Sequence, residues 1–333
     1  MPKIVLTFDY ELFLGKDSGT LENCLLKPVK KILDLFSHYR ACGIFFIDAT
    51  YLLTLKKYQH PSLSLCGEQI KEIAAAGCDI GLHLHPQWLD ACPAGDRWKF
   101  SSLEKYDIHS LDESQILGLF EQGLDILYHY ISPVRPNYRI KSFRAGGWLI
   151  NPFEKISTAF RKFGIEIDSS VLPGVKKNIG KWQYDFRSAP KDLLLWRFSR
   201  NPLLPQENGE FLELPVTTGK ITGRELLLLG LKKVFSEKNN IYGDGQLLVG
   251  RKNIWQALER IFKGEMRPLT VDGISRRLFF VSLKSVGEKN LLVWEIHPKM
   301  LTAVGLELIK YLVENYQTAG LDNLPEFFER ENG

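Results

Sequence analysis

Two histidines separated by one residue, His83 and His85, are the clearest candidates for metal chemistry in the sequence. Side chains at positions i and i+2 of a β-strand project to the same face, so two imidazoles there can bind one divalent ion. The chain has seven histidines in 333 residues, and this spacing rarely arises by chance. A pair of surface or core histidines is the alternative interpretation. Trp88 follows closely and offers an aromatic surface of the kind on which sugar rings stack.

Asp9 and Glu11 place two carboxylates two residues apart, directly after a short apolar run. If a strand continues through them, both side chains point to the same face. One carboxylate could then bind a metal while the other removes a proton. Either residue could take either role. For an isolated Asp-x-Glu, a solvated loop acid or a helix N-cap is the simpler interpretation.

Three later segments end in polar residues that could act with these groups. Arg144 precedes two glycines and Trp148, and its planar guanidinium suits a carboxylate partner. Asp168 begins an Asp-Ser-Ser sequence, and His297 follows a long apolar run and suits acid–base work near neutral pH. Taken singly, each could be structural: a surface arginine, an Asx turn or a core histidine. Their recurrence after successive apolar runs favours one shared site.

The apolar runs themselves are predicted to be β-strands alternating with helices. Seven runs qualify as strands: 3–8, 43–47, 78–82, 139–143, 164–167, 211–214 and 291–296. Helical periodicity marks 28–41, 67–76, 113–130, 152–163, 223–234 and 301–316. This alternation predicts an α/β fold with parallel strands covered on both faces. In α/β barrels the chemistry gathers at the C-terminal strand ends, where the polar residues above fall.

We expect one large domain over residues 1–333, with insertions around 175–210 and 236–290. The 43 basic and 39 acidic residues are interspersed, which argues against a nucleic-acid-binding stripe. No apolar stretch is long enough to span a bilayer. The sequence does not indicate an oligomeric state.

The N-terminus and the cysteines indicate the cellular compartment of the protein. The first apolar run is too short for a signal-peptide core and lacks a cleavage site. The five cysteines are widely spread and form no CxxC pair, which favours reduced thiols. We therefore expect a cytoplasmic protein.

In motif content and order, the chain resembles the metal-dependent polysaccharide deacetylases of carbohydrate esterase family four. The resemblance spans residues 3–300 and implies that family's distorted (β/α)7 barrel. The segments that carry it are 7–11, 43–48, 81–86, 144–148, 168–170 and 296–298.

Two positions depart from the family pattern. Tyr10 replaces the second aspartate of the first motif, with Glu11 one residue later. Gln87 stands where the family's second histidine falls at i+4, and the second imidazole is His85 at i+2. The chain is thereby similar to a variant branch associated with bacterial surface-polysaccharide synthesis.

The resemblance implies hydrolytic removal of an acetyl group from an N-acetylated sugar, with one divalent metal ion, zinc or else nickel, cobalt or iron. A workable assignment has Asp9 as base oriented by Arg144, and His297 as general acid oriented by Asp168. The metal ligands would be Glu11, His83 and His85, and the substrate-binding aromatic residues Trp88 and Trp148. Two alternatives remain: a metal amidohydrolase acting on a small non-sugar amide, and a non-catalytic sugar-binding protein with a decayed site.

Overall fold

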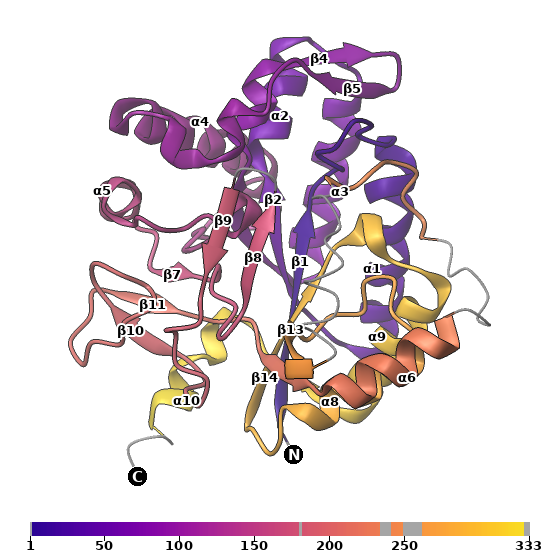
Figure 1. The fold of residues 1–333 in the computed structure, drawn as a ribbon. Coiled ribbons are helices and arrows are strands. Elements are labelled where there is room, and N and C mark those ends of the chain that lie inside the picture. The colour runs from indigo at the N-terminus through magenta and orange to yellow at the C-terminus, as the bar shows by residue number, and fades with distance from the viewer. Residues whose placement is uncertain (1, 180–181, 234–240, 249–261, 330–333) are drawn as a thin grey trace.

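The structure is a computed structural model that describes residues 2–179, 182–233, 241–248 and 262–329. Its centre is a curled sheet (Figure 1). Among the described residues, seven parallel strands form the main path of this sheet: β1 (Lys3–Tyr10), β2 (Ile44–Asp48), β3 (Asp79–Leu84), β6 (Ser142–Ala145), β7 (Ile167–Asp168), β11 (Phe211–Glu213) and β14 (Leu291–Ile296).

Neighbouring strands of the sheet follow the order of the chain, except that β14, the last of the seven in sequence, lies next to β1. The order is β11-β7-β6-β3-β2-β1-β14, so each of the seven predicted strands is present. At the outer end β10 (Trp196–Phe198) pairs antiparallel with β11. The two-residue strand β15 (Gln317–Thr318) pairs with the start of β1.

Backbone hydrogen bonds connect the two ends of this sheet. The Thr217 N–H, just beyond β11, donates to the carbonyl oxygen of Val293 in β14 at 3.0 Å. Leu269 N–H donates to Thr217 O at 2.8 Å, and Glu295 N–H donates to Leu269 O at 3.0 Å. The short segments around Thr217 and Leu269 thus fill the gap between β11 and β14. The predicted distorted (β/α)7 barrel is confirmed.

Helices surround the strands (Figure 1). Six correspond to predicted ones: α1 (Lys27–Tyr39), α3 (Ser62–Ala75), α4 (Glu113–Ile131), α5 (Glu154–Phe163), α6 (Gly223–Lys233) and α9 (Ala303–Asn315). In α1 the buried residues Val29, Ile32, Leu33 and Phe36 follow the i, i+3, i+4, i+7 spacing of an apolar helix face. Helix α2 (Ala49–Lys57) was not predicted, and it begins where the Asp48 side chain caps the Tyr51 N–H.

Successive side chains of β1 point to opposite faces of the sheet, and this alternation places the residues of the candidate site on one face. Phe8 faces outward, stacking on Phe45 with ring centroids 4.6 Å apart, and the Tyr10 hydroxyl donates to Gln69 of α3 at 3.0 Å. Thr7 and Asp9 consequently face the barrel interior, and Glu11 continues this row just past the strand. The lower interior is filled by an apolar cluster that includes Val5 and Phe46, which leaves the polar residues at the C-terminal strand ends.

The predicted insertions contain local hairpins and helices. Residues 175–210 include the antiparallel pair β8 (Lys176–Ile179) and β9 (Trp182–Asp185). The prediction for 236–290 falls partly outside the described residues, since 236–240 and 249–261 are not described. Its described part includes β13 (Glu265–Pro268), paired with β12 (Thr218–Ile221), and α8 (Arg276–Ser285). The remaining strands and α-helices are β4 (Ala91–Ala94) with β5 (Arg97–Phe100), and α10 (Pro325–Glu329).

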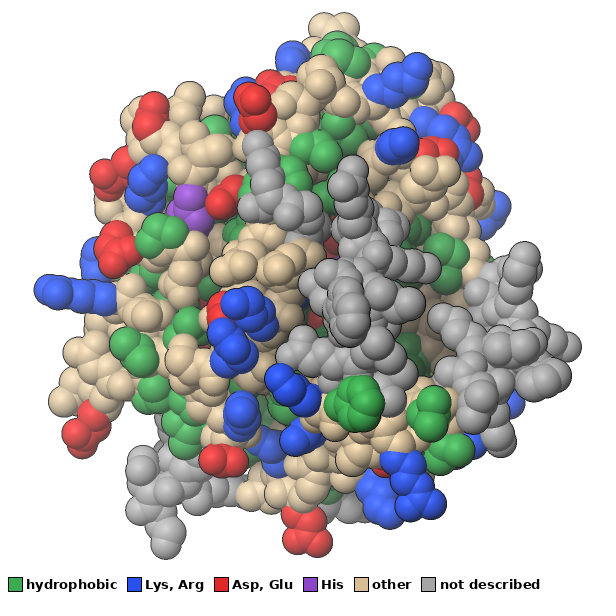
Figure 2. Space-filling view, in the orientation of Figure 1, with side chains coloured by type: hydrophobic (Ala, Val, Ile, Leu, Met, Phe, Trp, Pro, Cys, Tyr) green, Lys and Arg blue, Asp and Glu red, His purple; other side chains and the backbone are tan. Residues whose placement is uncertain are grey.

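Two surface properties bear on the partners. Basic and acidic side chains both occur around the rim of the face in Figure 2, and several Lys and Arg side chains gather below its centre. None of the described helices combines the length and apolar character needed to cross a bilayer. The structure gives all five cysteines as free thiols.

Candidate active site

A cavity of about 270 Å³ opens at the C-terminal ends of the barrel strands. It collects side chains that are hundreds of residues apart in the chain, from the ends of β1, β3 and β14. Five of the predicted residues with titratable side chains line it: Asp9, Glu11, His83, His85 and His297. Asp272, Glu295 and Lys299 line it as well.

Glu11, His83 and His85 converge on one point. Glu11 Oε2 lies 2.5 Å from His85 Nε2 and 3.3 Å from His83 Nε2. All three side chains are buried, and their potential ligand atoms lie within 4.8 Å of one another. Two imidazole nitrogens and one carboxylate oxygen are a common donor set for a catalytic zinc ion. The residues present therefore fit a divalent metal.

Strand register brings the His83 ring into this position. His83 lies opposite Asp48 of β2 on one side and Arg144 of β6 on the other. Its Nδ1 is 2.7 Å from the Arg144 carbonyl oxygen, a contact that requires Nδ1 to carry the proton and donate it. In the neutral ring Nε2 is then the unprotonated nitrogen, and it lies on the side of Glu11, as a metal ligand must. Nδ1 of His85 is buried without a partner.

A buried lysine contacts the second oxygen of Glu11. Lys299 Nζ donates to Glu11 Oε1 at 2.7 Å and to the Leu12 carbonyl oxygen at 2.8 Å. Burial alone would raise the pKa of Glu11, but the Lys299 ammonium and His85 outweigh it and hold that pKa well below its usual value. Glu11 is thus an anion with one oxygen on Lys299 and the other directed at two imidazoles.

Arg144 holds Asp9. The guanidinium is fully buried, and its Nη1 lies 2.5 Å from Asp9 Oδ1. It also donates to Thr7 Oγ1, Ser169 Oγ and the Ser169 carbonyl oxygen, which fixes its plane. Burial would raise the pKa of Asp9, but Arg144 and then His297 outweigh it and keep the carboxyl ionised. The expected contact between Arg144 and Asp9 is present in the structure.

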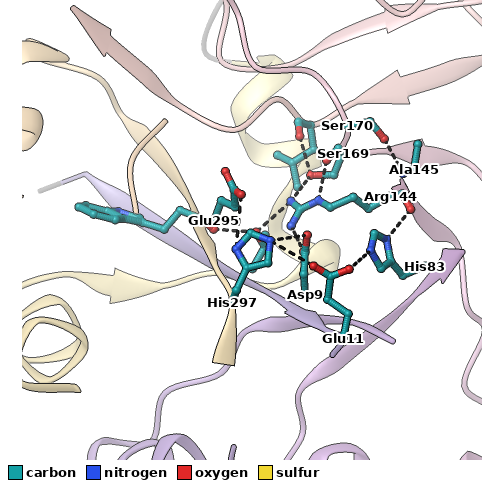
Figure 3. A network of polar contacts seen from close by, with 12 residues as sticks. Asp9, Glu11, His83, Arg144, Ala145, Ser169, Ser170, Glu295 and His297 are labelled. Carbon is teal, nitrogen blue, oxygen red and sulfur yellow. Dashed lines mark hydrogen bonds and ion pairs between the residues drawn. The ribbon is translucent and has the colours of Figure 1, made fainter. Parts of the chain in front are cut away.

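His297 lies across the pocket from His83, with Glu11 between them (Figure 3). Its Nε2 is 3.6 Å from Asp9 Oδ2 and 3.5 Å from Glu11 Oε1. Its Nδ1 donates to Asp272 Oδ2 at 2.7 Å, and its backbone N–H donates to the other Asp272 oxygen at 3.0 Å. Burial would lower the pKa of His297, but Asp272 and other carboxylates raise it to about 9. The ring is therefore protonated at neutral pH.

The prediction that Asp168 orients His297 is wrong. Both oxygens of Asp168 accept hydrogen bonds from Ser170, and its carboxyl also contacts that of Glu213 on the neighbouring strand β11. Both ring nitrogens of His297 are already engaged by Asp272 or directed at Asp9 and Glu11. Asp168 instead supports the Ser169–Ser170 turn on which Arg144 rests, because Ser169 accepts from the guanidinium.

The prediction that Trp88 binds substrate is also wrong. Trp88 is fully buried beneath β4 and β5, where it packs against Tyr51, Trp98 and Phe100. It belongs to the core. Trp148, the other predicted aromatic, does line the cavity, and Tyr106 lines it too.

Four charged residues that line the pocket were not predicted: Lys177, Asp272, Glu295 and Lys299. Glu295 precedes His297 by two positions on β14, so the period-two rule applied to Asp9 and Glu11 would have found it. Burial raises its pKa to about 7. Lys299 stands two residues past His297, within the short helix Pro298–Met300. Asp272 lies in an insertion, and we find no sequence signal that marks it.

The chain matches no protein-family model, and comparison with curated proteins finds no relative. Among solved structures it is similar to a candidate polysaccharide deacetylase from Mycobacterium smegmatis, at 15% identity and TM-score 0.48, covering 99% of this chain and 91% of that one. A peptidoglycan deacetylase from Bacillus subtilis gives 12% identity and TM-score 0.41, with 99% and 93% covered. A family 4 carbohydrate esterase from Streptomyces lividans gives 11% and 0.33, with 52% and 65% covered.

These TM-scores are below 0.5, so the structural similarity alone assigns no function. Any argument about function must rest on the residues of this chain. In its motifs, their order and its seven-stranded barrel, the chain is similar to the polysaccharide deacetylases of carbohydrate esterase family four.

Proposed function

We propose that this protein is a metal-dependent hydrolase that removes an acetyl group from an N-acetylated sugar. The observation that carries the proposal is the position of Glu11 Oε2, 2.5 Å from His85 Nε2 and 3.3 Å from His83 Nε2. Beside this triad lie an arginine-held carboxylate, Asp9, and a carboxylate-held imidazole, His297. Together they provide a ligand set, a base and an acid.

The same contacts support one of the two assignments that the sequence leaves open. Asp9 Oδ1 is engaged by Arg144, whereas Glu11 directs an oxygen at both imidazoles. We therefore assign Glu11, His83 and His85 as the ligands and Asp9 as the base. Zinc suits two imidazoles and a carboxylate, and nickel, cobalt or iron would accept the same set.

A divalent ion, when bound, supplies Lewis acidity toward water and toward the carbonyl oxygen of the substrate. The chain's own groups handle the protons. Asp9, ionised and fixed by Arg144, accepts the proton of the attacking water. His297, with Nδ1 held by Asp272, donates the Nε2 proton to the departing amine. Without that proton the amide C–N bond would expel an unstable anion.

A sugar substrate is supported by the aromatic residues of the cavity. Tyr106 and Trp148 both line it, and such rings provide flat apolar faces on which a pyranose can stack. The free thiols of all five cysteines suit a reducing compartment, and we place the protein in the cytoplasm.

A second candidate is a sugar-binding protein without metal. One observation favours it: Lys299 already neutralises Glu11, so the site has a cation of its own. Metal content separates the two candidates, because only a metalloenzyme needs an ion held by this triad.

The decisive experiment measures bound metal and acetate release in matched variants. Wild-type protein should contain about one divalent ion per chain and release acetate from an N-acetylated sugar. Glu11→Gln and His83→Ala should lose the ion, whereas Asp9→Asn should keep it and lose roughly 10²–10⁴-fold in rate. Unchanged metal in Glu11→Gln with loss in Asp9→Asn would exchange their roles. Metal-replete protein that hydrolyses no N-acetylated sugar would overturn the proposal.

A further inference from the structure

Residues 241–248 form a short segment that crosses the rim of the cavity. Leu247 and Leu248 of this segment line the cavity, together with Leu14 and Met300. Leu247 is 51% exposed although it is aliphatic. The side of the cavity with Tyr106 and Trp148 is therefore aromatic, while this segment contributes an aliphatic wall.

The segment is fastened to the barrel by one acidic residue. Both oxygens of Asp244 accept hydrogen bonds: Oδ1 from the Thr20 N–H at 2.8 Å, and Oδ2 from Asn23 Nδ2 at 3.0 Å. Arg97 Nη2 lies 3.0 Å from Asp244 Oδ2, and Nη1 donates to the Asp244 carbonyl oxygen at 3.1 Å. Such charge-assisted bonds are stronger than neutral ones.

Backbone contacts hold the segment on both sides of Asp244. Gly243 N–H donates to the Lys299 carbonyl oxygen at 3.1 Å, and Gln246 N–H donates to the Asp17 carbonyl oxygen at 2.9 Å. The approach at Gly245 is so close that a methyl group there would lie 2.6 Å from the Gly19 nitrogen. The segment thus docks on Lys299, the residue whose side chain holds Glu11.

We propose that residues 241–248 are a specificity wall of the active site, in which Leu247 and Leu248 contact the substrate and Asp244 is a positioning residue. The inference rests on the proposed deacetylase function and adds a substrate property to it. Besides its acetyl methyl, the substrate presents a further aliphatic group, such as another methyl, to this wall. Loss of the wall weakens substrate binding and leaves the acid–base groups and metal ligands in place.

Kinetics test the proposal in the holoenzyme with an N-acetylated sugar. Asp244→Ala should raise KM about ten-fold or more with kcat nearly unchanged, because several hydrogen bonds to a charged group are lost. Asp244→Asn should give a smaller increase, since its amide oxygen still accepts from Thr20. Asp96→Ala is the matched control: Asp96 also lies beside Arg97, at 3.9 Å, but its side chain is 76% exposed.

Two further variants keep the test independent of Asp244. Gly245→Ala should raise KM like Asp244→Ala, because its methyl group displaces the segment. Leu247→Ser, at a half-exposed position that folding does not need, should raise KM about three-fold through lost apolar contact. An unchanged KM in Leu247→Ser and Asp244→Ala overturns the proposal, as does an equal fall in kcat with constant KM.

Amide hydrogen exchange separates this inference from the function on which it rests. In Asp244→Ala the amides of Gly243 and Gln246 should exchange faster than in wild type and in Asp96→Ala, whether or not the protein hydrolyses any sugar. If these amides stay protected, Asp244 does not fasten the segment and the proposal is wrong. If they are released and wild type shows no deacetylation, the proposed function fails and the positioning role of Asp244 stands.

Discussion

The ammonium of Lys299 and the carboxylate of Glu11 form a buried ion pair with Nζ and Oε1 2.7 Å apart. The other oxygen of Glu11 is 2.5 Å from His85 Nε2. One carboxylate therefore joins a permanent cation of the protein to the point where we place the metal.

Replacement of Lys299 should show how far the stability of the fold depends on a positive charge beside Glu11. Lys299→Met leaves Glu11 buried without its counter-charge, and breaking such a pair costs about 3–5 kcal/mol of unfolding free energy. Added Zn²⁺ can replace the missing charge, so the gain in Tm on adding zinc should be larger in Lys299→Met than in wild type. Thermal unfolding with chelator and with zinc measures both. An equal gain in the two proteins would mean that Lys299 and the ion do not share Glu11.

The role of His297 predicts dependence on the leaving group. His297→Ala should keep its metal yet lose roughly 10²–10⁴-fold on an N-acetylated sugar, because the departing amine requires a proton. An activated aryl acetate ester needs no such proton and should be affected much less. Asp272→Asn should show the same selectivity to a smaller degree, since the imidazole remains but loses its carboxylate partner. Equal losses on amide and ester in His297→Ala would rule out the general acid.

The two tryptophans that the sequence predicts to bind substrate should behave in opposite ways. Trp148→Ala should raise KM roughly two- to twelve-fold, the loss expected from one aromatic contact, with little change in Tm. Trp88→Ala should lower the unfolding free energy by about 3–5 kcal/mol, because it empties a fully buried position. Chemical denaturation and steady-state kinetics on both variants check this. A KM effect confined to Trp88→Ala would contradict the placement of these rings.

The buried Asp168–Glu213 pair predicts how stability changes with pH. Burial, and then Asp168, raise the pKa of Glu213 well above its usual value, so the folded protein retains a proton that the unfolded chain releases. Above the unfolded pKa of about 4.3 the folded state binds more protons, and stability falls as pH rises. Glu213→Gln mimics the protonated carboxyl and should be more stable than wild type at neutral pH.

The comparison is made by urea unfolding at acidic and neutral pH. The advantage of Glu213→Gln should shrink as pH falls below about 4, where wild-type Glu213 becomes mostly protonated in both states. Glu213→Ala serves as the control, because it cannot donate to Asp168 at any pH. An advantage that is constant with pH would show that the carboxyl is ionised in the folded protein.

The sequence predicts the barrel well because its strands are nearly continuous apolar runs that each end in a polar residue. The same feature predicts that Asp9, His83 and His297 meet, since parallel strands share one C-terminal edge. Their ligand and acid–base roles stay predictions. Helix α2 was missed because its nine residues are buried on most sides and show little periodicity.

The errors concern partners that only the folded chain brings together. Asp272 reaches His297 from an insertion whose path depends on the Leu269 and Thr217 contacts, and no local sequence pattern predicts that path. Trp88 follows the histidine motif in sequence, but the short helix Pro86–Asp90 turns its ring into the core. In both cases a local sequence pattern indicates the type of residue, whereas long-range packing determines which side chains it contacts.

The placement of β1 between β2 and β14 has a consequence for synthesis on the ribosome. β2 is complete about forty residues after β1, whereas β14 emerges some 280 residues after it. During most of translation one edge of β1 therefore has no strand to pair with, and such open edges invite wrong pairing. His297 arrives with β14 and completes the catalytic set at the same moment. A nascent or truncated chain thus exposes a vulnerable edge and lacks His297, the residue that we propose as the general acid.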